Sequence, residues 1–125
     1  SALVFRQLKQ GKSIMPLKAS MQGSTLVIRV LDDRIDAAGA IQFKEQMRDL
    51  TATPSARVIL DLSNVQFLDS SGLGAVVAVM KLLAPERKLE LAGLTPTVEK
   101  VFRLTRMDTV FTIHPAVEAG LRQAG

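Results

Sequence analysis

The chain has 125 residues, of which 47% are hydrophobic and 22% are charged, as expected for one globular domain. It contains no cysteine, which excludes disulfides, thiolate chemistry and cysteine-ligated metal. The formal net charge is +4, but residues 1–31 hold five basic residues and no acidic ones, while residues 32–125 hold 11 basic and 12 acidic residues. The core therefore has no basic excess to attract nucleic acid, and no direct nucleic-acid contact is expected.

The first 14 residues show little hydrophobic periodicity. We expect them to be a leader, flexible or left by expression, ahead of a domain spanning residues 15–125. They carry no visible secretory signal. The longest apolar run, residues 73–80, is far too short to cross a bilayer. We therefore expect a cytoplasmic protein that makes no membrane contact.

The first elements expected along the chain are two strands and a helix. Residues 13–21 and 24–31 flank a turn signal at Gln22-Gly23, which predicts an antiparallel hairpin. After a polar loop, Asp36 is placed to cap a helix. The apolar face of that helix recurs at helical spacing, at Ala40, Phe43, Met47 and Leu50.

A short apolar run and a longer one come next. Residues 58–62 predict a buried strand, and residues 71–83, ended by Pro85, predict a buried helix. Further along, residues 88–92 alternate as a half-exposed strand does. The remaining elements expected are a helix opening at Thr95-Pro96 with a stripe of Val98, Val101 and Phe102, a strand at 110–113 and a helix opening at Pro115.

The resulting order is β-β-α-β-α-β-α-β-α. Strands that alternate with helices form parallel crossovers, whereas the opening hairpin adds an antiparallel edge. The sequence thus predicts an α/β domain with a mixed, mostly parallel sheet and helices packed on it.

Six residues, Asp69 to Gly74, join the buried strand to the buried helix and place two hydroxyls and a carboxylate at a helix start. Unpaired backbone N–H groups and a partial positive charge favour an anion there, so a serine at this point is well placed to carry a phosphate. A phosphate adds about −1.5 to −2 charges. Together with Asp69 and Asp36 it would repel a docked partner. The same residues are also common capping and turn chemistry that requires no further function.

Two glycines, Gly72 and Gly74, fall in the first turn of the expected helix, although glycine in a helix interior costs roughly 1 kcal/mol relative to alanine. Their presence indicates that something approaches the backbone closely. From the sequence, that could be a partner or the neighbouring strand.

Three other patterns carry little chemistry. His114 is the only histidine, and the sequence has no Gly-x-Ser-x-Gly motif, so no hydrolase triad is expected. One histidine without cysteine gives no support for a metal site. The Gly11-Lys12-Ser13 run lacks the first glycine and the preceding strand of a phosphate-binding loop. An acidic set, Asp32, Asp33 and Asp61, leaves a receiver-like domain phosphorylated on aspartate as a second alternative.

Residues 58–62 followed by Asn64 to Gly74 resemble the signature of the STAS domain, and more narrowly of bacterial anti-sigma factor antagonists. The resemblance covers about residues 15–124. It implies that Ser70 is phosphorylated by an anti-sigma factor that is also a serine kinase, and that Ser71 helps to shape the site. It also implies that Asp36 contacts the kinase, together with Asp69, Gly72, Leu73 and Gly74.

By the same resemblance, the protein is expected to be non-enzymatic and to have no cofactor, since ATP belongs to the kinase. The unphosphorylated form would hold the anti-sigma factor and so free a sigma factor, and a phosphoserine phosphatase would reset it. The alternative within the same fold is a scaffold module of a transporter or lipid-transport complex, with no phosphate cycle.

Overall fold

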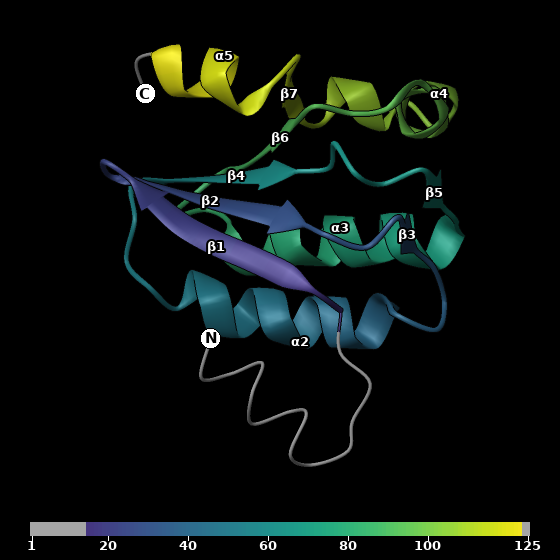
Figure 1. The fold of residues 1–125 in the computed structure, drawn as a ribbon, viewed down its shortest axis with the longest axis horizontal. Helices are drawn as coiled ribbons and strands as arrows, with labels where there is room; N and C mark the ends of the chain where they lie inside the picture. The colour runs from purple at the N-terminus through teal and green to yellow at the C-terminus, as the bar shows by residue number, and fades with distance from the viewer. Residues whose placement is uncertain (1–14, 124–125) are drawn as a thin grey trace.

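A hairpin forms one edge of the sheet in the computed structural model, which describes residues 15–123 (Figure 1). Strands β1 (Leu17–Gln22) and β2 (Thr25–Val30) are antiparallel, and Gln22 pairs with Thr25. The loop is therefore Gly23-Ser24, one residue later than the expected turn. Gly23 has a φ of +64°, a conformation that glycine adopts without the strain of a Cβ. The predicted hairpin is confirmed. The expected leader lies outside the described residues.

Three further strands continue the sheet in parallel, in the order β1-β2-β4-β6-β7. Helices on the connections give the expected alternation, so the predicted α/β fold with its mixed sheet is confirmed. A small separate pair of parallel strands, β3 and β5, was not predicted. The bounds of the remaining elements are β3 (Arg34–Ile35), α2 (Ala40–Thr51), β4 (Arg57–Asp61), β5 (Phe67–Leu68), α3 (Ser70–Leu83), β6 (Leu89–Ala92), α4 (Pro96–Leu104), η1 (Met107–Thr109), β7 (Thr112–His114) and α5 (Val117–Arg122).

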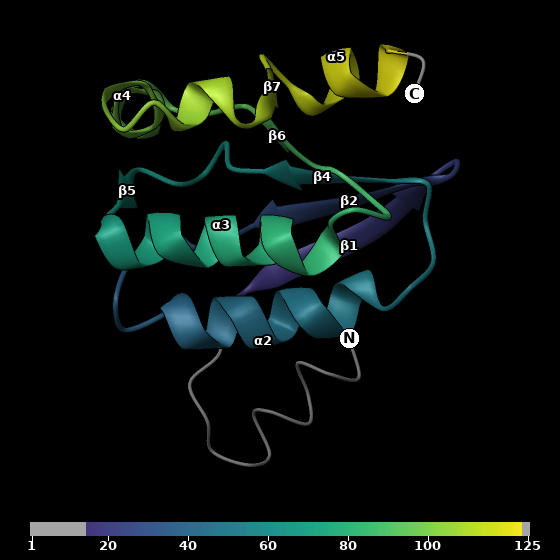
Figure 2. The same ribbon diagram turned by 180° about the vertical axis from the view of Figure 1, so that it is seen from behind.

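Helices α2 and α3 lie side by side over one face of the sheet (Figures 1 and 2). The apolar residues expected on α2 are turned inward, with Phe43 and Met47 fully buried. They meet alternate residues of the central strands, because side chains on a strand point to opposite faces in turn. Each such side chain contributes about 1.5–3 kcal/mol on burial. The strand residues of this core include Leu26, Ile28, Val58, Leu60, Leu89 and Leu91.

Helix α5 packs against β4 and β7 on the opposite face (Figure 2). Gly120 allows this approach, since a Cβ there would lie 2.8 Å from the His114 ring. This face holds a polar set that includes Arg57 and Glu90. None of the helices between residues 15 and 123 is both long and apolar enough to cross a bilayer.

The expected burial of one strand and the expected start of another are wrong. Residues 89–92 form a central strand that is buried throughout, not a half-exposed one. Glu90, the polar residue of the alternation, is only 7% exposed because Arg57 and His114 bind its carboxylate inside. The last strand begins at Thr112, since Met107 to Thr109 form a 3-10 turn that carries Val110 to the surface.

The starts of two helices are also corrected. Asp36 is not the N-cap of α2, which begins at Ala40 with Gly39 in the capping position. Asp36 instead closes a turn of three residues before the helix, accepting hydrogen bonds from the Gly39 and Ala40 amides on its backbone carbonyl. The last helix begins at Val117, because His114 belongs to β7 rather than to a helix start.

Candidate functional site

The turn into α3 is organised by the carboxylate of Asp69, which is the N-cap of the helix. Its Oδ1 accepts a hydrogen bond from the Gly72 amide at 2.8 Å, and its Oδ2 accepts one from the Ala37 amide at 3.2 Å. The first bond satisfies one of the orphan donors of the helix start. The second ties this turn to the one that precedes α2.

The small β3–β5 pair brings the two candidate carboxylates together. Ile35 pairs with Leu68 in parallel register, and Asp36 and Asp69 are the next residues along each strand. Because parallel strands end at the same edge, both carboxylates emerge at one side of the pair. The structure therefore unites two residues that lie 33 positions apart in the sequence.

Asp36 is held as an anion. Its Oδ2 accepts a hydrogen bond from Arg34 Nε at 2.8 Å, and its Oδ1 accepts one from the Gly39 amide at 3.2 Å. The Arg34 hydrogen bond is the main reason why the pKa of Asp36 lies below its ordinary value. The Arg34 guanidinium also stacks 4.6 Å from the centre of the Phe67 ring, which fixes its position.

Ser70 and Ser71 are exposed in the first turn of α3. Neither hydroxyl makes a hydrogen bond within residues 15–123, so both are available to solvent or to a partner. The helix N-terminus beneath them can stabilise an added anion. Asp69 and Asp36 beside them make any added phosphate part of a concentrated negative charge.

The two glycines of this turn have different surroundings. A Cβ on Gly72 would lie 2.1 Å from the Ile35 carbonyl oxygen, so the close neighbour of this glycine is strand β3. A Cβ on Gly74 would meet nothing within 4 Å, and this residue is exposed. Gly72 thus serves packing, while Gly74 leaves open space on the outer side of α3, next to the half-buried Leu73.

Sequence reasoning missed Arg34, Phe67 and Ala37. The backbone amide of Ala37 carries no sequence signal, and Arg34 and Phe67 meet only because β3 pairs with β5. By contrast, the receiver-like alternative, with its acidic set of Asp32, Asp33 and Asp61, is not favoured by the structure. Asp61 ends β4 and accepts a hydrogen bond from the Ser63 amide at 2.9 Å, and the opening hairpin has no place in a simple β-α receiver start.

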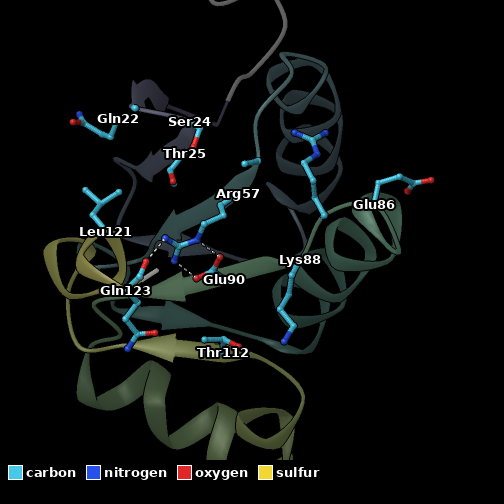
Figure 3. A pocket seen from close by; sticks show the side chains of 13 residues that line it. Gln22, Ser24, Thr25, Arg57, Glu86, Lys88, Glu90, Thr112, Leu121 and Gln123 are labelled. Atoms are coloured by element: carbon cyan, nitrogen blue, oxygen red, sulfur yellow. Dashed lines mark hydrogen bonds and ion pairs between the residues drawn. The ribbon is translucent and has the colours of Figure 1, made fainter. Parts of the chain in front are cut away.

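A second polar cluster lies at the other end of the sheet, where β4 begins, and lines an open cavity of about 900 Å³ (Figure 3). Arg57 binds both carboxylate oxygens of Glu90, and it also donates to the Gly120 and Gln123 carbonyls at 2.9 and 3.1 Å. His114 Nε2 lies 2.8 Å from Glu90 Oε1. These bonds tie the C-terminal end of α5 to the sheet.

The charge state of Glu90 follows from this cluster. Burial by itself would raise the pKa of Glu90, but the hydrogen bonds from Arg57 and His114 outweigh it and lower the pKa. The hydrogen bond to Glu90 in turn raises the pKa of Arg57. Arg57 and His114 both bind the Glu90 carboxylate, and Arg57 also holds the end of α5 through the Gly120 and Gln123 carbonyls.

Comparison with known proteins places this chain in a family. The chain is 28% identical over 95 residues to BtrV of Bordetella bronchiseptica, a protein whose name describes it as an anti-sigma factor antagonist. That match covers 75% of this chain and 82% of the relative.

Solved structures share the fold at lower identity. An anti-sigma factor antagonist of Mycobacterium paratuberculosis has a TM-score of 0.77 at 23% identity, covering 86% of this chain and 91% of that one. The phosphorylated form of SpoIIAA, a Bacillus cell fate determinant, has a TM-score of 0.60 at 23% identity, covering 86% and 98%. The murine anion transporter Slc26a9 also shares the fold, with a TM-score of 0.75 at 11% identity, covering 96% of this chain and 24% of the transporter. At these identities the likeness concerns the fold alone.

A model of the STAS domain matches residues 17–120, which is most of the chain and includes β1, the Asp69 turn and the first four residues of α5. This protein therefore belongs to the STAS domain family.

Proposed function

We propose that this protein is an anti-sigma factor antagonist whose binding to its partner is switched by phosphorylation of Ser70. The partner would be an anti-sigma factor with serine kinase activity, and holding it would free a sigma factor for transcription. The observation that carries the proposal is the exposed Ser70 hydroxyl at the start of α3, beside two anchored carboxylates. ATP would be consumed by the kinase, so the antagonist itself would be a binding protein without enzymatic activity.

The physics of the switch has two parts. A phosphate on Ser70 would sit at the N-terminus of α3, where the helix stabilises negative charge, so the modification would leave the fold intact. The same phosphate would stand beside the carboxylates of Asp69 and Asp36. A partner that docks on the neutral serine would then face like-charge repulsion and the cost of desolvating a dianion.

Asp36 gives the partner a fixed point of contact. Its carboxylate is held by Arg34 and by the Gly39 amide, so a cationic side chain of the kinase would meet an oriented anion. Ser71, Leu73 and Gly74 would extend this contact along the outer side of α3. A phosphatase would restore the binding form, and we place the cycle in the cytoplasm, where the kinase finds ATP.

The relatives favour this function over the transport scaffold. BtrV is named as an antagonist at 28% identity, and SpoIIAA has been obtained in a phosphorylated form. The transporter shares the fold at 11% identity.

The test is phosphotransfer. The chain is incubated with ATP and, in turn, with each serine-kinase anti-sigma factor of the source genome, and intact and fragment mass spectra are recorded. We expect one phosphate, on Ser70, with one of these kinases. Ser70→Ala should accept none, and the matched control Ser71→Ala should still accept it. Phosphate on Ser71 alone, or no transfer from any kinase, would overturn the switch and favour the scaffold.

A further inference from the structure

Residues of α2 and α3, the two helices that lie side by side on one face of the sheet (Figure 2), line a shallow groove. It has a volume of about 300 Å³. Two residues of α2 and four of α3 line it: Lys44, Arg48, Ala78, Val79, Lys81 and Leu82. None of these residues has a part in the Ser70 turn.

The apolar lining of the groove is Ala78, Val79 and Leu82, and Leu82 is 46% exposed. Ile41 lies outside the groove, one turn before Lys44 on the same side of α2, and is 60% exposed. On α3 the outer side runs from Ser71 through Gly74 and Ala78 to Leu82 at helical spacing. The small residues in this stripe let another backbone approach closely, and a Cβ on Gly74 would meet nothing within 4 Å.

The rim of the groove is basic. Lys44, Arg48 and Lys81 line it, no acidic residue does, and none of the three forms an ion pair within residues 15–123. The acidic residues of α2, Glu45 and Asp49, each follow a rim residue by one position, which turns them about 100° around the helix. The outer surface is therefore negative at the start of α3, around Asp36 and Asp69, and positive towards its end.

We infer that this groove binds an acidic amphipathic helix of the partner protein. The apolar side of that helix would lie on Ala78 and Leu82, and its carboxylates would meet the basic rim, which is the usual way in which a groove between helices receives a helix. The identity of the partner rests on the proposed function. The chemistry of the bound helix, acidic and amphipathic, rests only on the residues that line the groove.

This contact differs from the switch in one respect. Lys81 lies 11 residues after Ser70, which is about 16 Å along α3 at 1.5 Å per residue. That distance exceeds the screening length of about 8 Å at physiological salt. Phosphorylation should therefore weaken docking at the start of α3 while leaving the groove contact unchanged.

The probe for the test is a synthetic amphipathic helical peptide of about 14 residues, with leucines on one side and glutamates along its flanks. It is titrated at low salt into the whole chain, uniformly labelled with nitrogen-15, and amide shifts are followed by NMR. We expect shifts in residues 41–48 and 74–82 and none in α5. A matched peptide with lysine in place of glutamate should bind at least about tenfold more weakly, or about 1.4 kcal/mol.

Charge reversal on the protein gives the second arm. The triple variant Lys44→Glu, Arg48→Glu, Lys81→Glu should bind the acidic peptide at least about tenfold more weakly. A control triple, Lys18→Glu, Lys88→Glu, Lys100→Glu, changes the net charge equally on exposed sites elsewhere and should bind within about twofold of the parent. If both peptides bind alike, if shifts fall outside the groove, or if the control triple loses as much, the inference is wrong.

A second copy of this chain is the competing occupant. Sedimentation of the chain alone would overturn the inference if it showed a dimer that the groove triple abolishes. The two proposals also fail separately. If the peptide does not bind but Ser70 is phosphorylated, only the groove inference is rejected. If the peptide binds but Ser70 is not phosphorylated, only the switch is rejected.

Discussion

Asp69 and Ala37 are joined by a hydrogen bond from the Ala37 amide to Asp69 Oδ2, at 3.2 Å. Through its other oxygen, Asp69 also caps α3. One carboxylate thus holds together the two loops that carry the site. The position of Ser70 relative to Asp36 depends on this side chain and on the β3–β5 pairing beneath it.

Removing the carboxylate should loosen both loops. We expect Asp69→Ala to lower the free energy of unfolding by about 1–3 kcal/mol, because it removes a helix cap and a second hydrogen bond. Asp69→Asn keeps one acceptor oxygen and should lose less. Urea denaturation measures both, with Asp49→Ala on the exposed side of α2 as the control. An Asp69→Ala protein as stable as the control would contradict this role.

The neutral and charged replacements of Ser70 should separate folding from binding. Ser70→Asp places a negative charge at the N-terminus of α3, where it should leave stability unchanged or raise it by about 0.3–1 kcal/mol. Binding to the kinase identified by phosphotransfer should nonetheless weaken at least about tenfold. Calorimetric titration measures the affinity, and Ser70→Asn, similar in size but uncharged, is the matched control. Equal affinities for the two variants would show that charge is not the switch.

Asp36 should matter for binding rather than for stability. Asp36→Asn keeps an acceptor for the Gly39 amide but removes the anion that we propose as the contact for the partner. We expect a loss of affinity for the kinase of about tenfold or more, with a change in unfolding free energy of less than about 1 kcal/mol. Asp33→Asn, in the exposed loop nearby, serves as the comparison. A loss shared by both variants would point to general electrostatics instead of a specific contact.

The two glycines of the turn offer a matched pair. Gly72→Ala should destabilise by about 1–3 kcal/mol, because its Cβ would have to displace the Ile35 carbonyl oxygen from 2.1 Å. Gly74→Ala has open space and should stabilise by about 0.4–1 kcal/mol through the helix propensity of alanine. Denaturation of the two variants side by side decides. The two changes in unfolding free energy should have opposite signs. Equal losses of stability in both variants would refute the different roles assigned to Gly72 and Gly74.

Stability should fall in acid through Glu90. The folded state holds the pKa of Glu90 below its ordinary value, so this group contributes its full stabilisation only above the unfolded value of about 4.3. That contribution is lost as the pH falls through the folded-state pKa. Glu90→Gln should therefore show a smaller fall in unfolding free energy between about pH 6 and pH 3 than the parent. Glu99→Gln, on the exposed side of α4, should keep the parent slope. If the unfolding free energies of the parent and Glu90→Gln changed with pH in parallel, the role of the Glu90 carboxylate would be refuted.

Local patterns in the sequence determined the order of the helices and of the five main-sheet strands, the hairpin and the apolar face of α2, because spacing of 2 or 3.6 residues encodes which side of an element is buried. They also identified the Asp69 to Gly74 turn, since helix capping uses residues within one turn of each other. Residues in contact at these separations can be recognised without knowing where the chain goes next.

Only the tertiary structure decided which distant residues meet. The pairing of β3 with β5 brings Asp36 beside Asp69, and the insertion of β6 between β4 and β7 buries Glu90 against Arg57 and His114. The close neighbour of Gly72 in α3 is likewise distant in sequence, the Ile35 carbonyl of strand β3. These contacts join residues of separate elements that lie 24 to 37 positions apart in the sequence. Local periodicity does not predict them, because they follow from how whole elements pack on the sheet.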